Sequence, residues 1–170
     1  MKILYKPKRI KYFMNVAKLT ANESYSEKLK VGVVAVRENR IVATGYNGTP
    51  PGASNICETV AEKRYVKFSD WQKMLDLKDG WRPSLEDIFT WERLTAVPDL
   101  IHAEHNLILF AEAHNIDLAS CDLFQTIAPC AACASRLHDV GVRTIFYLED
   151  YKNTGGIDFS EEMHIERVTT

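Results

Sequence analysis

The pattern of apolar positions predicts a helix followed by two strands in the first part of the chain. Residues 30–36 contain a continuous apolar run, residues 31–36, that is typical of a buried strand. The polar residues 38–40 predict a turn, and residues 41–45 predict a returning strand. Before them, residues 8–23 are expected to form an amphipathic helix, because four apolar residues recur there at helical spacing: Ile10, Phe13, Met14 and Ala17.

Helical and strand patterns alternate again in the later part of the chain. Residues 103–115 and 131–140 predict helices, and Gly141 is a typical residue to follow a helix C-terminus. Residues 122–126 and 143–148 predict short strands. This order of elements favours an α/β sandwich with a mixed sheet.

The segment of residues 55–100 interrupts this alternation. We interpret it as an insertion within a single domain that spans residues 1–170. Residues 60–77 and 84–94 have helical character, with Ser84 as the expected N-cap of the second helix. The segment contains all three tryptophans, which we expect to pack in its interior: Trp71, Trp81 and Trp91.

Composition and charge limit the classes of function. With 170 residues, 46% hydrophobic and 26% charged, the chain is typical of a soluble globular protein. Its net charge of -2 offers no general attraction for a polynucleotide, so a nucleic-acid partner is disfavoured. No apolar run is long enough to predict a membrane-spanning helix, and the basic start does not resemble a secretory signal. We therefore expect a cytoplasmic protein without a membrane partner.

Two short motifs carry the candidate chemistry, and each precedes a predicted helix. The first is His102-Ala103-Glu104, and the second is Pro129-Cys130-Ala131-Ala132-Cys133. Cysteines three residues apart lie on one side of a helical turn, and the positive field of a helix N-terminus favours thiolates. A lone C-x-x-C pair is also typical of a redox site or of half of a structural zinc site. Only the two motifs in combination predict a catalytic zinc site.

His102, Cys130 and Cys133 would hold zinc with three protein ligands. Three ligands leave a fourth position for water, which is typical of a catalytic zinc site. Glu104 is two residues from the histidine and is a candidate to move protons. The combination H-x-E…P-C-x-x-C is the signature of zinc-dependent nucleobase deaminases.

At these residues the chain resembles the cytidine deaminase superfamily, and within it the deoxycytidylate deaminases. The loop of residues 45–52, Gly-Tyr-Asn-Gly-Thr-Pro-Pro-Gly, is similar to the G-Y-N-G-x-P-x-G loop of that family. The resemblance covers most of residues 10–55 and 100–155. It includes further matching positions outside the motifs: Val31, Gly32, Asn106 and Thr126.

The resemblance implies a three-layer α/β/α sandwich around a five-stranded mixed sheet, assembled as a homohexamer. It implies hydrolysis of dCMP to dUMP and ammonia, which supplies dUMP for thymidylate synthesis. It also implies activation by dCTP, with Mg²⁺ as the ion that would accompany this effector, and inhibition by dTTP. The catalytic cofactor is then one Zn²⁺ per chain.

By the same resemblance, the site residues are assigned position by position. Asn47 would hold the deoxyribose hydroxyl, and the alternative is a turn residue that tolerates left-handed geometry. Lys28, together with Lys30, would lie near the phosphate, and the alternative for both is a solvated surface lysine. The remaining assignments are substrate contacts for Tyr151, Ala103 and Thr126, effector binding for Gly48, zinc binding for His102, Cys130 and Cys133, and proton transfer for Glu104.

Three residues depart from the family pattern. His105 stands where the family has an aliphatic residue, and we expect it to pack rather than to bind metal. Cys57 and Cys121 belong to no close motif, and no second, structural zinc site can be assembled around them.

Four other functions compete with this interpretation. A free-nucleoside deaminase of the same superfamily would need no phosphate site, and a tRNA adenosine deaminase should be more basic. A structural zinc module would recruit Cys57 or Cys121 as a fourth ligand and would leave Glu104 without a role. A C-x-x-C oxidoreductase would leave His102 without one.

Overall fold

The computed structural model describes residues 5–67, 81–84, 89–151 and 162–169. It consists of two compact units. Unit 1 comprises Met1–Tyr25, Lys30–Gly48 and Ile101–Thr170, and unit 2 comprises Ser26–Leu29 and Thr49–Leu100. The expected insertion at 55–100 falls within unit 2, and its description as part of a single domain stays a prediction.

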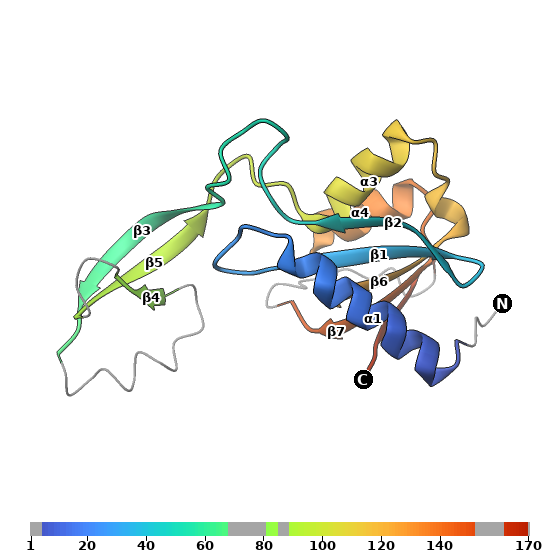
Figure 1. Ribbon diagram of the computed structural model, residues 1–170, viewed down its shortest axis with the longest axis horizontal. Helices are drawn as coiled ribbons and strands as arrows, with labels where there is room; N and C mark the ends of the chain where they lie inside the picture. The colour runs from blue at the N-terminus through green and yellow to red at the C-terminus, as the bar shows by residue number, and fades with distance from the viewer. Residues whose placement is uncertain (1–4, 68–80, 85–88, 152–161, 170) are drawn as a thin grey trace. The chain divides into compact units, whose positions relative to one another are not determined.

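Unit 1 contains a five-stranded mixed sheet (Figure 1). Its order is β2-β1-β6-β7-β8, where β1–β2 and β1–β6 pair antiparallel and β6–β7 and β7–β8 pair parallel. The mixed sheet is confirmed, and its fifth strand, β8, had no counterpart in the sequence pattern. The strands are β1 (Gly32–Arg37), β2 (Arg40–Tyr46), β6 (Asp122–Ile127), β7 (Thr144–Glu149) and β8 (His164–Arg167).

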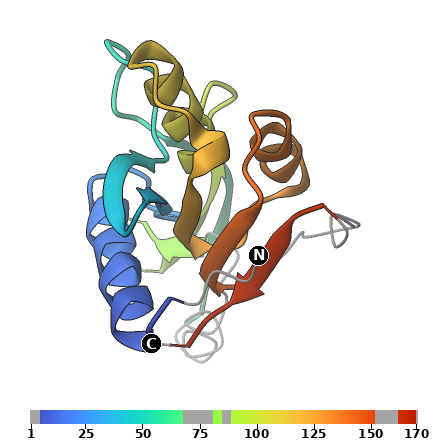
Figure 2. The ribbon, with the colours of Figure 1, turned by 90° about the vertical axis from the view of Figure 1, so that its right-hand side faces the viewer.

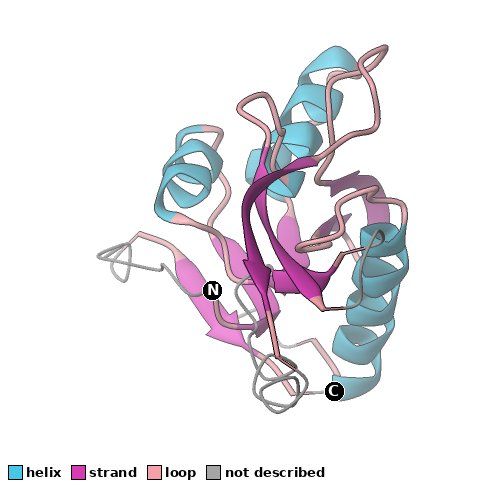
Figure 3. Ribbon diagram, turned by 90° about the vertical axis from the view of Figure 1, so that its left-hand side faces the viewer, coloured by secondary structure: helices cyan, strands magenta, loops and turns pink. Residues whose placement is uncertain are grey.

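Helices cover both faces of this sheet, which confirms the three-layer arrangement (Figures 2 and 3). Alternate residues of β6 point to opposite faces: Phe124 packs with α1, whereas Leu123 packs with the helices of the other face. Among the described residues, no helix has the length and apolar character needed to cross a bilayer. The helices are α1 (Pro7–Asn22), α3 (Ala103–Ala113) and α4 (Ala131–Asp139), with a 3₁₀ turn at Leu118–Ser120.

The helix ends agree closely with the sequence prediction. Pro7 occupies the first turn of α1, where its missing N–H would have no partner within the helix. Gly141 follows α4 with a φ of 90°, a conformation that glycine adopts without strain.

Unit 2 is a three-stranded antiparallel sheet in the order β3-β5-β4, formed by Glu58–Tyr65, Thr90–Ala96 and Trp81–Pro83. The predicted helices are therefore wrong for residues 60–65 and 90–94. The helical propensity of the glutamate, lysine and arginine residues here is outweighed by cross-strand pairing of β-branched and aromatic residues. Residues 68–77 and 85–88, and with them Trp71, lie outside the described residues.

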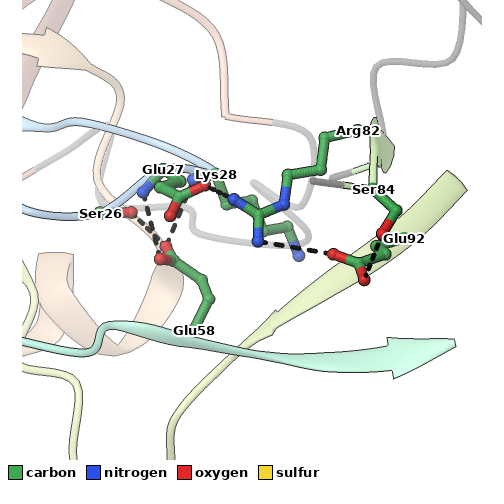
Figure 4. A network of polar contacts seen from close by, with 7 residues as sticks. All are labelled: Ser26, Glu27, Lys28, Glu58, Arg82, Ser84 and Glu92. Atoms are coloured by element: carbon green, nitrogen blue, oxygen red, sulfur yellow. Dashed lines mark hydrogen bonds and ion pairs between the residues drawn. The ribbon is translucent and has the colours of Figure 1, made fainter. Parts of the chain in front are cut away.

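Charged side chains tie this sheet together (Figure 4). Glu92 is buried, and its carboxylate meets the Lys63 ammonium at 3.0 Å and the Arg82 guanidinium at 3.5 Å. The Ser84 hydroxyl donates to Glu92 at 3.1 Å and so links this residue to β5. Its predicted role as an N-cap involves residues 85–88, which lie outside the described residues. The Glu58 carboxylate accepts from the hydroxyl of Ser26 and from nearby backbone N–H groups, those of Glu27 and Lys28. Trp91 is buried in the sheet, as expected, and Trp81 is half-buried beneath the Arg64 guanidinium.

Candidate active site

The structure brings the three predicted metal ligands together. The ligand atoms of His102, Cys130 and Cys133 lie within 4.8 Å of one another. His102 Nδ1 is 3.7 Å from the Sγ atom of Cys130 and 3.3 Å from that of Cys133. His102 is exposed and Cys133 is buried, so the group borders solvent on one side.

Two helix starts form this group. His102 is the residue before α3, and Cys130 is the residue before α4 at the end of the β6 connection. An isolated antiparallel bridge joins Gly48 to Ile101, with N–H to carbonyl distances of 3.0 and 2.8 Å. The bridge holds the loop after β2 directly beside the residue that precedes His102.

The environment of the Cys133 thiol differs from the sequence expectation. Burial raises the pKa of Cys133 above its ordinary value, and the nearby Glu104 and Cys130 raise it further. The expected stabilisation of a thiolate by the helix N-terminus is therefore outweighed by the loss of solvent. A cation between the two sulfurs would reverse this balance, and one imidazole with two thiolates is a donor set that suits zinc.

Glu104 lies in the first turn of α3 and is 4% exposed. Burial raises the pKa of its carboxyl, while contacts with Cys133 and Gln125 act in the opposite direction. A buried carboxyl next to a metal-binding group, with a pKa moved toward neutrality, is suited to accept a proton and return it.

Asn47 and Thr126 both contact the beginning of β1. The Oδ1 atom of Asn47 accepts from the Val31 N–H at 2.8 Å, and Thr126 Oγ1 accepts from the Gly32 N–H at 3.2 Å. Because these partners are consecutive, the two predicted substrate contacts lie at the same end of the sheet. Asn47 is buried, so it is positioned more firmly than a solvated turn residue.

For the other predicted substrate contacts, the structure gives the exposure and the unit to which each residue belongs. Ala103 is the fully buried first residue of α3. Tyr151 is half-buried just after β7, and Lys30 is exposed in unit 1. Lys28 is exposed and belongs to unit 2. The substrate role of these residues and the effector role of Gly48 stay predictions.

Three residues near the site lie outside the predicted set of contacts. Asn106 donates from Nδ2 to the Tyr46 carbonyl at 2.8 Å and so fixes the residue before Asn47. Gly45 lies within β2 and has no positive φ. Its function is close packing, because a Cβ atom there would lie 2.5 Å from the Ala103 carbonyl oxygen. The third residue, Gln125 on β6, is fully buried. In the sequence, a polar residue within a predicted helix or strand is the signal that could have identified Asn106 and Gln125 as supporting residues.

The residues that depart from the family pattern do not join the metal group. Within the part of the chain that the structure describes, this group contains His102, Cys130 and Cys133 alone. His105 instead accepts from the Arg136 guanidinium at 2.9 Å. Burial, together with the charge of Arg136, lowers the pKa of His105. Cys121 is buried in the core of unit 1, and Cys57 is buried in unit 2.

The class of protein follows from this arrangement, because an α/β fold that places a His-Cys-Cys group beside a buried glutamate defines the zinc-dependent nucleobase deaminases. A family model confirms the class and narrows it. The family described as "Cytidine and deoxycytidylate deaminase zinc-binding region" matches residues 7–149, and the chain belongs to this family. It is thus a hydrolase that acts on a carbon–nitrogen bond.

Individual relatives are similar over most of the chain. The deoxycytidylate deaminase of Enterobacteria phage T4 is 29% identical over 158 residues, covering 85% of this chain and 80% of that protein. The deoxycytidylate deaminase of Mycobacterium phage D29 is 31% identical, covering 80% and 91%. The crystal structure of the dCMP deaminase from cyanophage S-TIM5 in complex with dCMP and dUMP has a TM-score of 0.72 and 26% identity, covering 97% of this chain and 100% of that chain.

Proposed function

We propose that this protein hydrolyses dCMP to dUMP and ammonia. The observation that carries the proposal is the convergence of His102, Cys130 and Cys133 within 4.8 Å beside the buried Glu104. The substrate follows from relatives named deoxycytidylate deaminase, including one whose crystal structure holds dCMP and dUMP.

His102, Cys130 and Cys133 would hold one catalytic zinc ion per chain, which when bound activates water as a nucleophile. Glu104 would take a proton from the water molecule and deliver it to the ring nitrogen, and would then carry the second proton of that oxygen to the leaving amino group. Its burial keeps bulk water from competing for that proton. The exocyclic nitrogen leaves as ammonia, and the oxygen from water remains on the ring carbon.

The substrate would be oriented by the loop that the Gly48–Ile101 bridge holds in place. Asn47 is proposed to bind the deoxyribose hydroxyl, with its amide oriented by the contact with the Val31 N–H. Ala103 and Thr126 are proposed to contact the nucleotide at the beginning of α3 and the end of β6. Lys28 is proposed as a contact near the phosphate, because charge-assisted hydrogen bonds favour a nucleotide over a nucleoside. Tyr151 is proposed as a further contact of the substrate.

The regulatory and assembly expectations belong to the same proposal. They are activation by dCTP with Mg²⁺, inhibition by dTTP, a homohexamer, supply of dUMP for thymidylate synthesis, and a cytoplasmic location. Their support is the resemblance of the loop at residues 45–52 to that of the deoxycytidylate deaminases.

Product formation from a panel of substrates tests the proposal. Zinc-loaded protein is assayed for ammonia release from dCMP, deoxycytidine, cytidine and AMP, with and without dCTP. We expect kcat/KM to be clearly highest for dCMP. Equal efficiency on dCMP and deoxycytidine would reject the nucleotide assignment. A zinc-containing protein that releases ammonia from none of them would favour a structural zinc module.

A further inference from the structure

His105 has no part in the proposed chemistry, yet its side chain makes a defined contact between two helices. Its Nδ1 atom lies 2.9 Å from the Arg136 guanidinium. His105 belongs to α3 and Arg136 belongs to α4, and the two residues are 31 positions apart along the chain. The contact therefore joins the two helices whose starts form the metal-binding group.

The chemistry of this pair determines which atom donates. An arginine guanidinium stays charged and can only donate, so the Nδ1 atom of His105 accepts. The imidazole is then the neutral tautomer with its proton on Nε2. Because the donor is charged, the hydrogen bond is stronger than one between two neutral groups. An aliphatic side chain in place of His105 would offer Arg136 no acceptor.

On both helices the pair follows the metal-binding residues at the same spacing. His105 comes three residues after His102, and Arg136 comes three residues after Cys133. Residues three apart are neighbours on the surface of a helix. The pair is thus a link between α3 and α4 next to the one that a metal ion would make.

The metal-binding group depends on the relative position of these helices, because its ligands come from two separate segments. His102 directly precedes α3, whereas Cys130 and Cys133 belong to the beginning of α4. A metal site loses affinity when its ligands are displaced by about 0.5–1 Å, so the residues that support the ligands matter for binding. A link beside the ligands reduces the ordering that an ion has to impose when it binds.

We propose that His105 and Arg136 are positioning residues that hold α3 and α4 together beside the ligands and so preorganise the zinc site. The inference rests on the proposed function, in which the group binds zinc. Neither side chain is assigned as a ligand, because in the described part of the chain the group consists of His102, Cys130 and Cys133. Loss of the pair should therefore make zinc leave faster without changing the number of ions bound per chain.

His105→Leu tests the proposal, because leucine is close to histidine in size but accepts no hydrogen bond. Zinc-loaded protein is mixed with an excess of EDTA, and the zinc that stays with the protein is measured at intervals. We expect the dissociation rate to rise about fivefold, which is the scale of one hydrogen bond.

His114→Leu is the matched control, since it makes the same change on the same helix. The His114 imidazole stacks on Phe110 and bonds to its carbonyl, so its contacts stay within the C-terminal part of α3. This variant should release zinc at the wild-type rate. A rate in His105→Leu that equals the rate in His114→Leu would overturn the proposal.

A double-mutant cycle shows whether the two side chains act as a pair. Arg136→Met should accelerate zinc release about as much as His105→Leu, and the double variant should be no faster than either. Increases that multiply in the double variant would mean that the side chains act independently, and this would overturn the proposal.

Thermal unfolding with and without zinc separates positioning from a general loss of stability. Zinc raises Tm by an amount that depends on its affinity for the folded protein. At a fixed concentration of free zinc, we expect a smaller rise in Tm for His105→Leu than for the wild type or His114→Leu. A lower Tm in both states with an unchanged rise on zinc binding would reduce the pair to a structural link and overturn its positioning role.

These measurements require no deamination, so they separate this inference from the proposed function. A wild-type protein that holds zinc but deaminates no nucleotide would count against the proposed function alone. A wild-type protein that deaminates dCMP, with an unchanged zinc dissociation rate in His105→Leu, would overturn only the positioning role.

Discussion

Among the described residues, each compact unit buries one glutamate, and the two carboxyls are held in opposite ways. Glu104 in unit 1 is 4% exposed, and burial raises its pKa. Glu92 in unit 2 is 6% exposed, but the hydrogen bond from Lys63, helped by Ser84 and Arg82, lowers its pKa. Burial alone therefore does not determine the protonation of either group.

The contrast distinguishes a structural carboxylate from a reactive one. Glu92 is matched by two cations across the strands, Lys63 and Arg82, so its charge is part of the sheet. Figure 4 shows the contact with Arg82. Burial disfavours the charged form of Glu104 more than its neighbours favour that form, so its pKa is raised and it can change protonation during a reaction. Unit 1 should therefore respond to substitutions mainly in chemistry, and unit 2 mainly in stability.

The largest effect is expected from the loss of Cys133 in unit 1, with Cys57 in unit 2 as the control. Cys133→Ala removes one of three ligands, so zinc content should fall from about one per chain to near zero and deamination should be lost. Cys57→Ala removes a buried thiol outside the metal group and should leave the zinc content unchanged. Metal analysis of both purified variants, with activity assays, checks the pair. Zinc loss in Cys57→Ala would indicate that unit 2 contributes a ligand.

The next effect compares the two glutamates directly. Glu104→Gln keeps the shape of the side chain but removes its capacity to accept a proton, so kcat should fall by roughly 10² or more while zinc stays bound. Glu92→Gln should leave kcat near the wild-type value and lower the thermal stability of unit 2. Steady-state kinetics, metal analysis and thermal unfolding of both variants measure these effects. Comparable losses of kcat in both variants would break the distinction drawn above.

A glycine substitution tests how closely unit 1 is packed. Gly45→Ala places a methyl group against the Ala103 backbone, so the free energy of unfolding should fall by about 1–3 kcal/mol, as for other overpacked sites. Gly48→Ala is the control for stability, since the nearest atom to an added Cβ there is 4.0 Å away. Chemical denaturation of both variants measures the difference. Equal stabilities would show that β2 and α3 can separate without cost.

The smallest expected effect is the loss of stability at acidic pH that comes from Glu92. Because the folded-state pKa of Glu92 lies below its ordinary value of 4.5, its contribution to stability is present above that value. This contribution is lost as the pH falls through the lower folded-state value. Amide hydrogen exchange in β3 and β5 should therefore accelerate on acidification, and Glu92→Gln should flatten this dependence. An acid response that is identical in the variant would assign the effect to other carboxyls.

The elements of unit 1 could be predicted because their signals are local. Apolar runs and helical spacing mark β1, β6, α1 and α3, and the two metal-binding motifs each occupy a few consecutive residues. β8 escaped prediction because His164–Arg167 is short and mostly polar, and its pairing partner β7 precedes it in sequence. In unit 2, Glu62, Lys63 and Arg64 favour a helix locally, while their pairing with β5 is not visible in the sequence.

The site residues likewise divide into those with a local sequence signal and those whose contacts depend on the fold. His102, Cys130, Cys133 and Glu104 follow from spacing and chemistry alone. The supporting contacts of Asn106 and Gln125 do not, because each joins a side chain to an atom of another element or another part of its own strand. Such contacts depend on the folded positions of the elements, which the motif spacing does not contain.

The hydrogen-bonded pair Gly48 and Ile101 has a consequence for protein engineering. These two residues flank the segment 49–100, and they exchange both of their backbone hydrogen bonds. The segment 49–100, the longer of the two segments of unit 2, therefore leaves unit 1 and returns to it at a closed point. Because the entropy of closing a loop rises only slowly with its length, this point can accept segments of very different sizes. Replacing residues 49–100 by a short turn, or by a foreign peptide, would leave the ends of the graft already joined.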